Sequence, residues 1–124
     1  MSKPMRIYVA GPYSAPTRDG VEANIQRAMR TAASCMFRGH DAHCPHTATD
    51  PIEQYATAYH KGWLDYERWM RLDFGLIRHW ATALFYIAPS PGTDRELALA
   101  EELGLTVFRS LDEVPDLRKL GGRL

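Results

Sequence analysis

The sequence lacks the features that mark several large classes of protein. It holds only two cysteines, Cys35 and Cys44, in 124 residues, which is too few for a disulfide framework. No apolar run approaches the roughly 18 residues of a membrane span, and the first residues do not resemble a secretory signal. We therefore expect a cytoplasmic protein that makes no contact with a membrane.

An excess of charge of one sign is also missing. Lys and Arg number 15, Asp and Glu number 15, and the net charge is zero. A protein that binds a nucleic acid polymer usually carries a basic excess, so we expect no such partner. A small anionic ligand needs only local donors and is not excluded. The length of the chain suits a single domain over residues 1–124.

Short β-rich apolar runs alternate with helical patterns along the chain. Strands are predicted at residues 6–10, 41–46, 81–87 and 106–108. Helices are predicted at residues 21–36, from residue 50 onward, at 62–80 and at 93–103. The helix from residue 50 is expected because Asp50 can cap it and Pro51 suits its first position. This alternation predicts an α/β fold with a parallel sheet of four to five strands and helices on both faces.

Ligands of such sheets bind beyond the carboxyl ends of the strands, which directs attention to the loops there. Gly11-Pro12-Tyr13-Ser14 follows the first strand. Its glycine allows close approach to a ligand, and the next helix can hold an anion at its start. The segment matches neither a P-loop nor a dinucleotide fingerprint. The alternative is an ordinary turn that exposes Tyr13 and Ser14.

The second loop of interest joins the third predicted strand to the helix at 93–103. Ser90 offers a hydroxyl group, Gly92 leaves space, and Glu96 lies in the first turn of the helix. Thr93 and Glu96 also have the spacing of a capping box, in which Glu96 binds only the backbone. The residues alone leave both interpretations open.

Asp73 lies on the aromatic-rich helix before the third strand. A carboxyl group among aromatic side chains can have a raised pKa and donate a proton. The alternative is an exposed Asp73 paired with Arg71 or Arg78. The predicted helix places Asp73 about 10 Å back from its end, below the expected site, so Asp65 and Glu67 are alternative acids.

Histidines near the second strand do not form a metal site. His43 and Cys44 point to opposite faces of a strand and cannot bind one ion together, and the spacing matches no zinc motif. We expect Cys44 in the core and His40 on the surface. His46, at the carboxyl end of this strand, is expected to contact a substrate.

Several motifs together resemble the nucleoside 2-deoxyribosyltransferase-like superfamily, which includes nucleoside deoxyribosyltransferases and nucleoside 5′-monophosphate N-glycosidases. The motifs are Ile7 to Ser14, Asn24, Gly39-His40, Pro45-His46, Asp73, and Ser90 to Ala100. The resemblance runs over nearly the whole chain and is closest to small members that begin with a Gly-Pro-Tyr-Ser turn. It implies one Rossmann-like, flavodoxin-like domain over residues 1–124.

The resemblance also implies roles for individual residues. Glu96 resembles the catalytic nucleophile, Asp73 the acid that assists the leaving base, and Tyr13 the aromatic residue beside the sugar. Ser90 and Gly92 match the turn that holds the sugar or its 5′-phosphate. The residues expected to bind substrate are Gly11, Pro12, Ser14, His46, Ser90 and Gly92.

These roles predict cleavage of the N-glycosidic bond of a nucleoside or nucleoside 5′-monophosphate. A carboxylate can trap the oxocarbenium-like sugar as a covalent ester while an acid protonates the base, and no metal or organic cofactor is needed. The alternatives are deoxyribosyl transfer between bases and a nucleotide-binding module without turnover.

A homodimer or larger homo-oligomer is expected for two reasons. Trp63, Tyr66, Trp69 and Trp80 give one segment more aromatic surface than a small core should absorb. Members of the superfamily that the chain resembles also complete their sites with residues of a neighbouring subunit.

Overall fold

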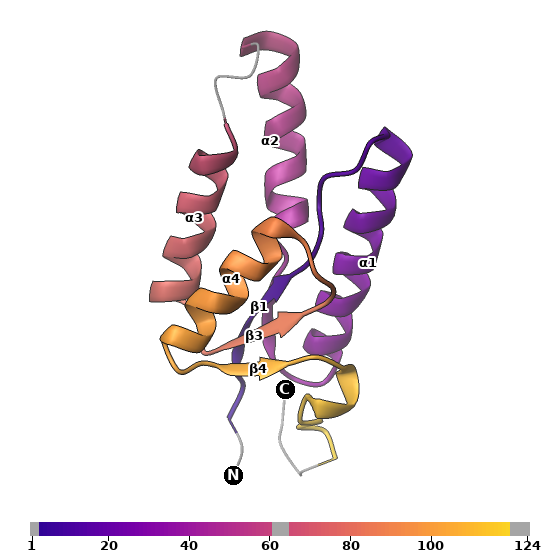
Figure 1. The fold of residues 1–124 in the computed structure, drawn as a ribbon. Helices are drawn as coiled ribbons and strands as arrows, with labels where there is room; N and C mark the ends of the chain where they lie inside the picture. Colours follow the sequence, from indigo (N-terminus) through magenta and orange to yellow (C-terminus); the bar gives the residue numbers. More distant parts are fainter. Residues whose placement is uncertain (1–2, 61–64, 120–124) are drawn as a thin grey trace.

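A four-stranded parallel sheet forms the centre of the computed structural model, which describes residues 3–60 and 65–119 (Figure 1). Its strands are β1 (Arg6–Ala10), β2 (Asp41–His43), β3 (Ala83–Tyr86) and β4 (Thr106–Phe108). They are arranged in the order β2-β1-β3-β4, and all neighbouring pairs are parallel. This is the strand order of flavodoxin-like folds. The predicted α/β class and the parallel sheet are confirmed.

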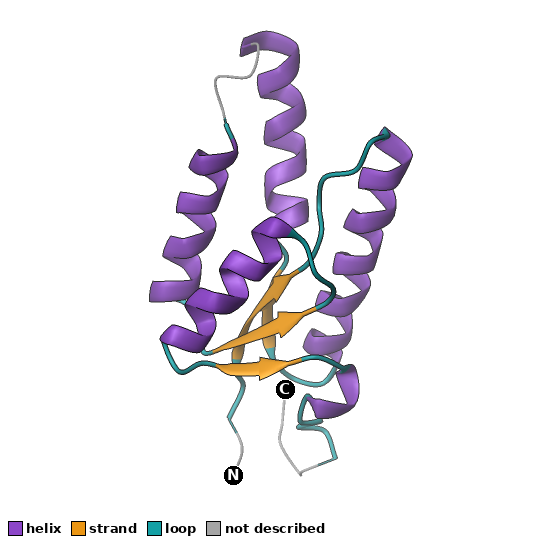
Figure 2. Ribbon diagram, in the orientation of Figure 1, coloured by secondary structure: helices purple, strands orange, loops and turns teal. Residues whose placement is uncertain are grey.

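Helices cover both faces of the sheet, as the sequence predicts (Figure 2). They are α1 (Arg18–Phe37), α2 (Pro45–His60), α3 (Tyr66–His79) and α4 (Pro91–Glu102), followed by a 3-10 turn, η1 (Leu111–Glu113). Helix α1 lies against one face, α3 and α4 lie against the other, and α2 projects beyond the carboxyl ends of the strands (Figure 1).

The alternation of side chains along β1 divides the core between the two faces. Ile7 and Val9 belong to the clusters on the α1 side. Tyr8 and Ala10 belong to the cluster formed with α3 and α4. All four side chains are fully buried. The hydroxyl of Tyr8 is therefore directed toward the face that carries α3 and α4.

The predicted boundary between the second strand and the next helix is wrong. Strand β2 ends at His43 rather than residue 46, and α2 begins at Pro45 rather than after Asp50. Proline favours the first turn of a helix because its missing N–H has no partner there. Pro51 instead lies inside α2. His46 consequently belongs to the first turn of a helix, not to the end of a strand.

The third strand and the helix after it also differ from prediction. Strand β3 covers four residues, fewer than the predicted 81–87. Helix α4 begins at Pro91 with Ser90 as its N-cap, and the Ser90 side chain accepts from the Thr93 backbone N–H at 3.1 Å. Ser90 rather than Thr93 therefore caps this helix. Of the helix predicted at 62–80, α3 covers Tyr66–His79, and residues 61–64 lie outside the described part.

His40, expected on the surface, is buried with only 4% of its surface exposed. Its Nδ1 accepts from the backbone N–H of Met5 at 3.0 Å, so Nε2 carries the proton and donates to the Pro115 carbonyl at 2.7 Å. The imidazole thereby joins the start of β1 to the C-terminal segment. Cys44, expected in the core, is half-buried and packs against the α1-side cluster.

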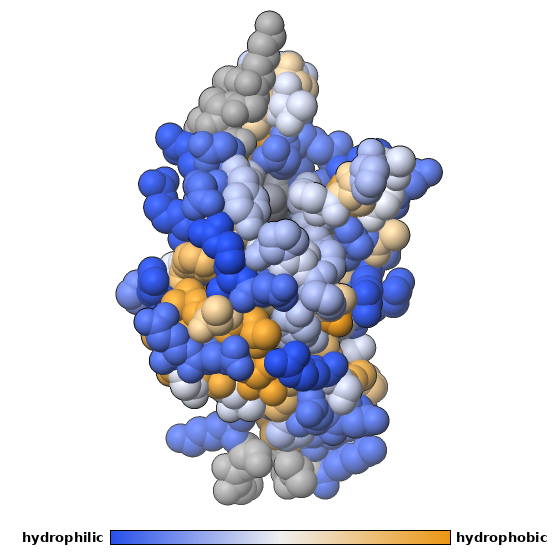
Figure 3. Space-filling view, viewed as in Figure 1, coloured by the Kyte–Doolittle hydropathy of each residue, from blue (hydrophilic) through white to orange (hydrophobic). Residues whose placement is uncertain are grey.

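The face of the protein drawn in Figure 3 is largely polar. In Figure 3, apolar side chains gather over the C-terminal ends of α3 and α4, while the surrounding surface is hydrophilic. Leu72, in the middle of α3, is 53% exposed, and Leu103, the C-cap of α4, is 43% exposed. Among residues 3–60 and 65–119, no helix combines the length and apolar character needed to cross a membrane.

Candidate active site

A pocket of about 480 Å³ opens beyond the carboxyl ends of β1 and β3. The connection after β1 leads to β2 on one side of the sheet, whereas the connection after β3 leads to β4 on the opposite side. Parallel sheets bind ligands at such a switch point, and the volume suits a small molecule. The predicted site residues that line the pocket are Gly11, Tyr13, Ser14, His46, Asp73, Ser90, Gly92 and Glu96. Of the predicted set, only Pro12 does not line it.

Glu96 lies in the N-terminal half of α4 with 6% of its surface exposed. The interpretation of Glu96 as a cap is wrong, because Ser90 caps this helix. The Glu96 carboxyl instead accepts a hydrogen bond from the hydroxyl of Tyr8. Tyr8 was not predicted to belong to the site. A tyrosine between two apolar residues in a strand buried on both faces is the signal that could have identified it.

Asp73 lines the same pocket from α3. The charge of Asp73 acts on both the Tyr8 hydroxyl and the Glu96 carboxyl group, and raises the pKa of each. The alternative of an exposed Asp73 paired with an arginine is wrong. Asp73 comes level with the pocket because β3 is only four residues long.

Burial dominates the electrostatics of the two carboxyl groups. It raises the pKa of Glu96 from 4.5 to about 8, although the Tyr8 hydrogen bond acts in the opposite direction. The charge of nearby Asp73 raises the pKa of Glu96 further. Burial also raises the pKa of Asp73 from 3.8 to about 6, again opposed by Tyr8. Two close carboxyl groups in a poorly solvated site hold a proton between them near neutral pH.

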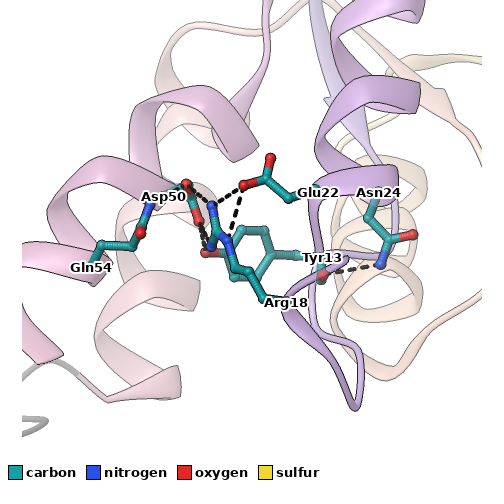
Figure 4. Close-up of polar contacts among 6 residues, drawn as sticks. All are labelled: Tyr13, Arg18, Glu22, Asn24, Asp50 and Gln54. Carbon is teal, nitrogen blue, oxygen red and sulfur yellow. Dashed lines mark hydrogen bonds and ion pairs between the residues drawn. The ribbon is translucent and has the colours of Figure 1, made fainter. Parts of the chain in front are cut away.

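Tyr13 is held in place by a network of polar side chains (Figure 4). Its hydroxyl donates to Asp50 Oδ1 at 2.7 Å, and Arg18 donates to both oxygens of Asp50 at 2.8 and 2.9 Å. Asn24 of α1 donates to the Tyr13 carbonyl at 3.0 Å. The hydrogen bonds from Arg18 and Tyr13 lower the pKa of Asp50 to about 2. The loop after β1 is therefore a fixed wall of the pocket, although Ser14 is exposed.

His46 links the start of α2 to the same loop. Its Nε2 donates to the Pro12 carbonyl at 2.8 Å, which explains how Pro12 contributes without lining the pocket. The ring is 4% exposed, and burial lowers the pKa of His46, so the imidazole is neutral at pH 7. Its Nδ1 is buried and has no hydrogen-bond partner among the described residues.

A second wall of the pocket was not predicted. The indole N–H of Trp69, on α3, donates to Glu53 Oε2, on α2, at 2.5 Å. Both residues line the pocket. The contact joins two helices through side chains 16 residues apart, and neither residue stands in a recognisable motif.

The alternative acids do not reach the site. Asp65 caps α3 by accepting from the Arg68 backbone at 2.9 Å, and exposed Glu67 pairs with Arg95 at 2.8 Å. Neither of them lines the pocket. Within the described ranges, no group of three or more His, Cys, Asp and Glu residues is placed to hold a metal ion.

No family model matches the chain, and no curated protein sequence matches it.

The raised pKa of Glu96 predicts how stability depends on pH. Between about pH 5 and 8, the folded protein keeps a proton on Glu96 that the unfolded chain has lost. The free energy of unfolding therefore falls as the pH rises through this window. The side chain in Glu96→Gln does not titrate. Between about pH 5 and 8, the free energy of unfolding of this variant should therefore fall less than that of the wild type, by on the order of 3 kcal/mol.

Urea unfolding at several pH values measures this difference. Glu102→Gln is the matched control, because Glu102 is exposed at the end of the same helix. The control should follow the wild type at every pH. An identical pH dependence for Glu96→Gln and the wild type would contradict the assignment.

Proposed function

We propose that the protein cleaves the N-glycosidic bond of a nucleoside or nucleoside 5′-monophosphate, with Glu96 as nucleophile. The observation that carries the proposal is the pairing of two carboxyl groups, Glu96 and Asp73, in one pocket at the switch point of the sheet. The motifs shared with the nucleoside 2-deoxyribosyltransferase-like superfamily support the same roles.

In the first step, the Glu96 carboxylate attacks C1′ of the sugar as the C1′–N bond breaks. The electron pair of that bond leaves with the base. The hydrogen bond from Tyr8 favours the anionic form of Glu96. The positive charge that develops on the sugar in the transition state favours the anion further. The product is a glycosyl ester of Glu96.

Asp73 carries the proton that the leaving base needs. In the free protein the pKa order leaves the shared proton mainly on Glu96, so the reactive form, with the charge on Glu96 and the proton on Asp73, is the minor one. The raised pKa of Asp73 lets its carboxyl group hold that proton near neutral pH, which suits a general acid. After the base departs, the Asp73 carboxylate takes a proton from water and the resulting hydroxide adds to C1′. The bond between C1′ and the Glu96 oxygen breaks, which releases the sugar and restores the Glu96 carboxylate. If a second base enters instead of water, the same site transfers the sugar. Tyr13 and the turn at Ser90 and Gly92 hold the sugar.

The role of Glu96 is tested by base release. Glu96→Ala should lower kcat/KM by at least about 10³-fold, because the covalent step is lost for every substrate. The assay follows free base from a panel of nucleosides and nucleoside 5′-monophosphates, with and without an added acceptor base. Glu102→Ala is the control. Acceptor-dependent turnover alone would indicate transfer. Unchanged turnover in folded Glu96→Ala would assign Glu96 a structural role, and absence of turnover in the wild type would favour a binding module.

The role of Asp73 is tested by changing the leaving group. General acid catalysis contributes about 10²–10⁴-fold, so Asp73→Asn should lose that factor on a natural substrate. On a 4-nitrophenyl glycoside of the same sugar, whose leaving group departs without a proton, the loss should be much smaller. Equal losses on both substrates would mean that Asp73 supports the structure rather than the leaving base.

We also propose that the chain forms a homodimer or larger homo-oligomer. Of the aromatic residues that suggested this, Tyr66 and Trp69 line the pocket, Trp80 packs against the core, and Trp63 lies outside the described residues. The support is instead the apolar patch over the C-terminal ends of α3 and α4 in Figure 3, together with the exposure of Leu72 on α3 and Leu103 at the end of α4.

Light scattering at micromolar concentration should give at least twice the 14.1 kDa mass of the chain. Leu72→Lys should lower that mass, whereas Ala33→Lys, at an exposed position of α1, should not. A monomeric wild type would exclude the proposal.

A further inference from the structure

The pocket face of α3 extends beyond Asp73. Trp69 precedes Asp73 by four residues and Tyr66 precedes it by seven, so the three side chains follow one face of the helix. All of them line the pocket. Because α3 leads into the start of β3, its N-terminal end lies toward the carboxyl edge of the sheet. Measured along the helix axis, Trp69 therefore lies about 6 Å further than Asp73 beyond the carboxyl ends of the strands. That distance is comparable to the length of a nucleobase.

Glu53 provides hydrogen-bond acceptors at this outer level. Its Oε2 accepts from the Trp69 indole at 2.5 Å, which fixes the carboxyl group against α3. Its other oxygen, Oε1, accepts no hydrogen bond from the described residues. Glu53 is half-buried and lines the pocket. A ligand there would meet an oriented acceptor beside an aromatic ring.

The charge of the pocket indicates what such a ligand must offer. The described lining includes the acidic residues Glu53, Asp73 and Glu96, and it includes no lysine or arginine. A group facing Glu53 must therefore bring its own N–H donors. Enzymes that act on a base commonly recognise it by hydrogen bonds to its Watson–Crick edge and by stacking on aromatic rings.

We infer that Glu53, oriented by Trp69, determines the specificity of the site for guanine. The inference rests on the proposed function, which places the sugar at Glu96 and the glycosidic nitrogen near Asp73. The far edge of the base then reaches Glu53. Guanine presents two adjacent donors on this edge, N1–H and the 2-amino group, and a carboxylate can accept both. Hypoxanthine presents only N1–H, and adenine presents a lone pair at N1 that faces the carboxylate unfavourably.

Glu53→Gln is a sharp test because the two side chains have the same shape. The glutamine carbonyl can keep the hydrogen bond from Trp69, which places the amide N–H₂ group where Oε1 stands. A donor then faces the donors of guanine. A site built to bind a polar group discriminates strongly when a partner is lost. The variant should therefore bind guanine substrates roughly 10- to 100-fold more weakly.

Binding is measured by calorimetry in a Glu96→Gln background, which prevents turnover, with and without Glu53→Gln. The ligands are 2′-deoxyguanosine, 2′-deoxyinosine and 2′-deoxyadenosine, each also as the 5′-monophosphate. With Glu53 present, the guanine compound should bind about 10-fold or more tightly than the hypoxanthine compound. Glu53→Gln should abolish that preference. Glu102→Gln in the same background should preserve it, and thermal melting should verify that each variant is folded.

The results separate this inference from the proposed function. Equal affinity for guanine and hypoxanthine compounds, an equal effect of Glu53→Gln on all ligands, or no binding at all would overturn the role of Glu53. Base release by the wild-type protein is measured separately. Glu53-dependent binding of guanine without base release would uphold this inference and refute the proposed N-glycosidase activity.

Discussion

The hydrogen bond from Tyr8 to Glu96 joins β1, one of the two central strands of the sheet, to α4, the helix that carries the proposed nucleophile. A buried carboxyl group is costly unless a partner replaces the water that it loses. Tyr8 can serve as that partner because its own position is fixed by the register of β1 against β3, in which Tyr8 stands beside Leu84. A shift of one residue would turn the hydroxyl toward α1. The arrangement of the site therefore depends on the pairing at the centre of the sheet.

The two carboxyl groups are also placed by the core beneath them. Asp73 precedes buried Ile77 by four residues on α3, and Glu96 precedes buried Leu99 by three on α4. Residues at these spacings share one face of a helix. Each carboxyl group thus continues an apolar stripe that packs against the sheet. The contacts that hold α3 and α4 together also hold the acidic pair in place.

The fold was largely predictable because its signals are local. The apolar run at β1 and the helical periodicity of α1 identify both elements without knowledge of the rest of the chain. The boundaries around Pro45 and Ser90 were not predictable, since the signals there compete. Asp50-Pro51 has the appearance of a helix start, but Asp50 is instead engaged by Arg18 and Tyr13 from other segments.

The candidate site was predictable to a similar extent and for a related reason. Residues in the loops after β1 and β3 converge because the carboxyl ends of parallel strands share one edge. Tyr8 reaches Glu96, and Trp69 reaches Glu53, through contacts between segments that lie 88 and 16 residues apart in the sequence. The spacing of residues in the sequence does not predict such contacts.

The short length of β2 and β4 limits how the protein can associate with other molecules through the edges of its sheet. Both strands stand at the edges of the sheet, and each has only three residues. An edge strand offers unpaired backbone groups to any extended chain that approaches it, and a short one offers few. Asp41 and Thr106, which begin these strands, are moreover exposed and polar. The sheet is thus poorly suited to grow sideways into aggregates, which leaves its helical surfaces to make contact with other molecules.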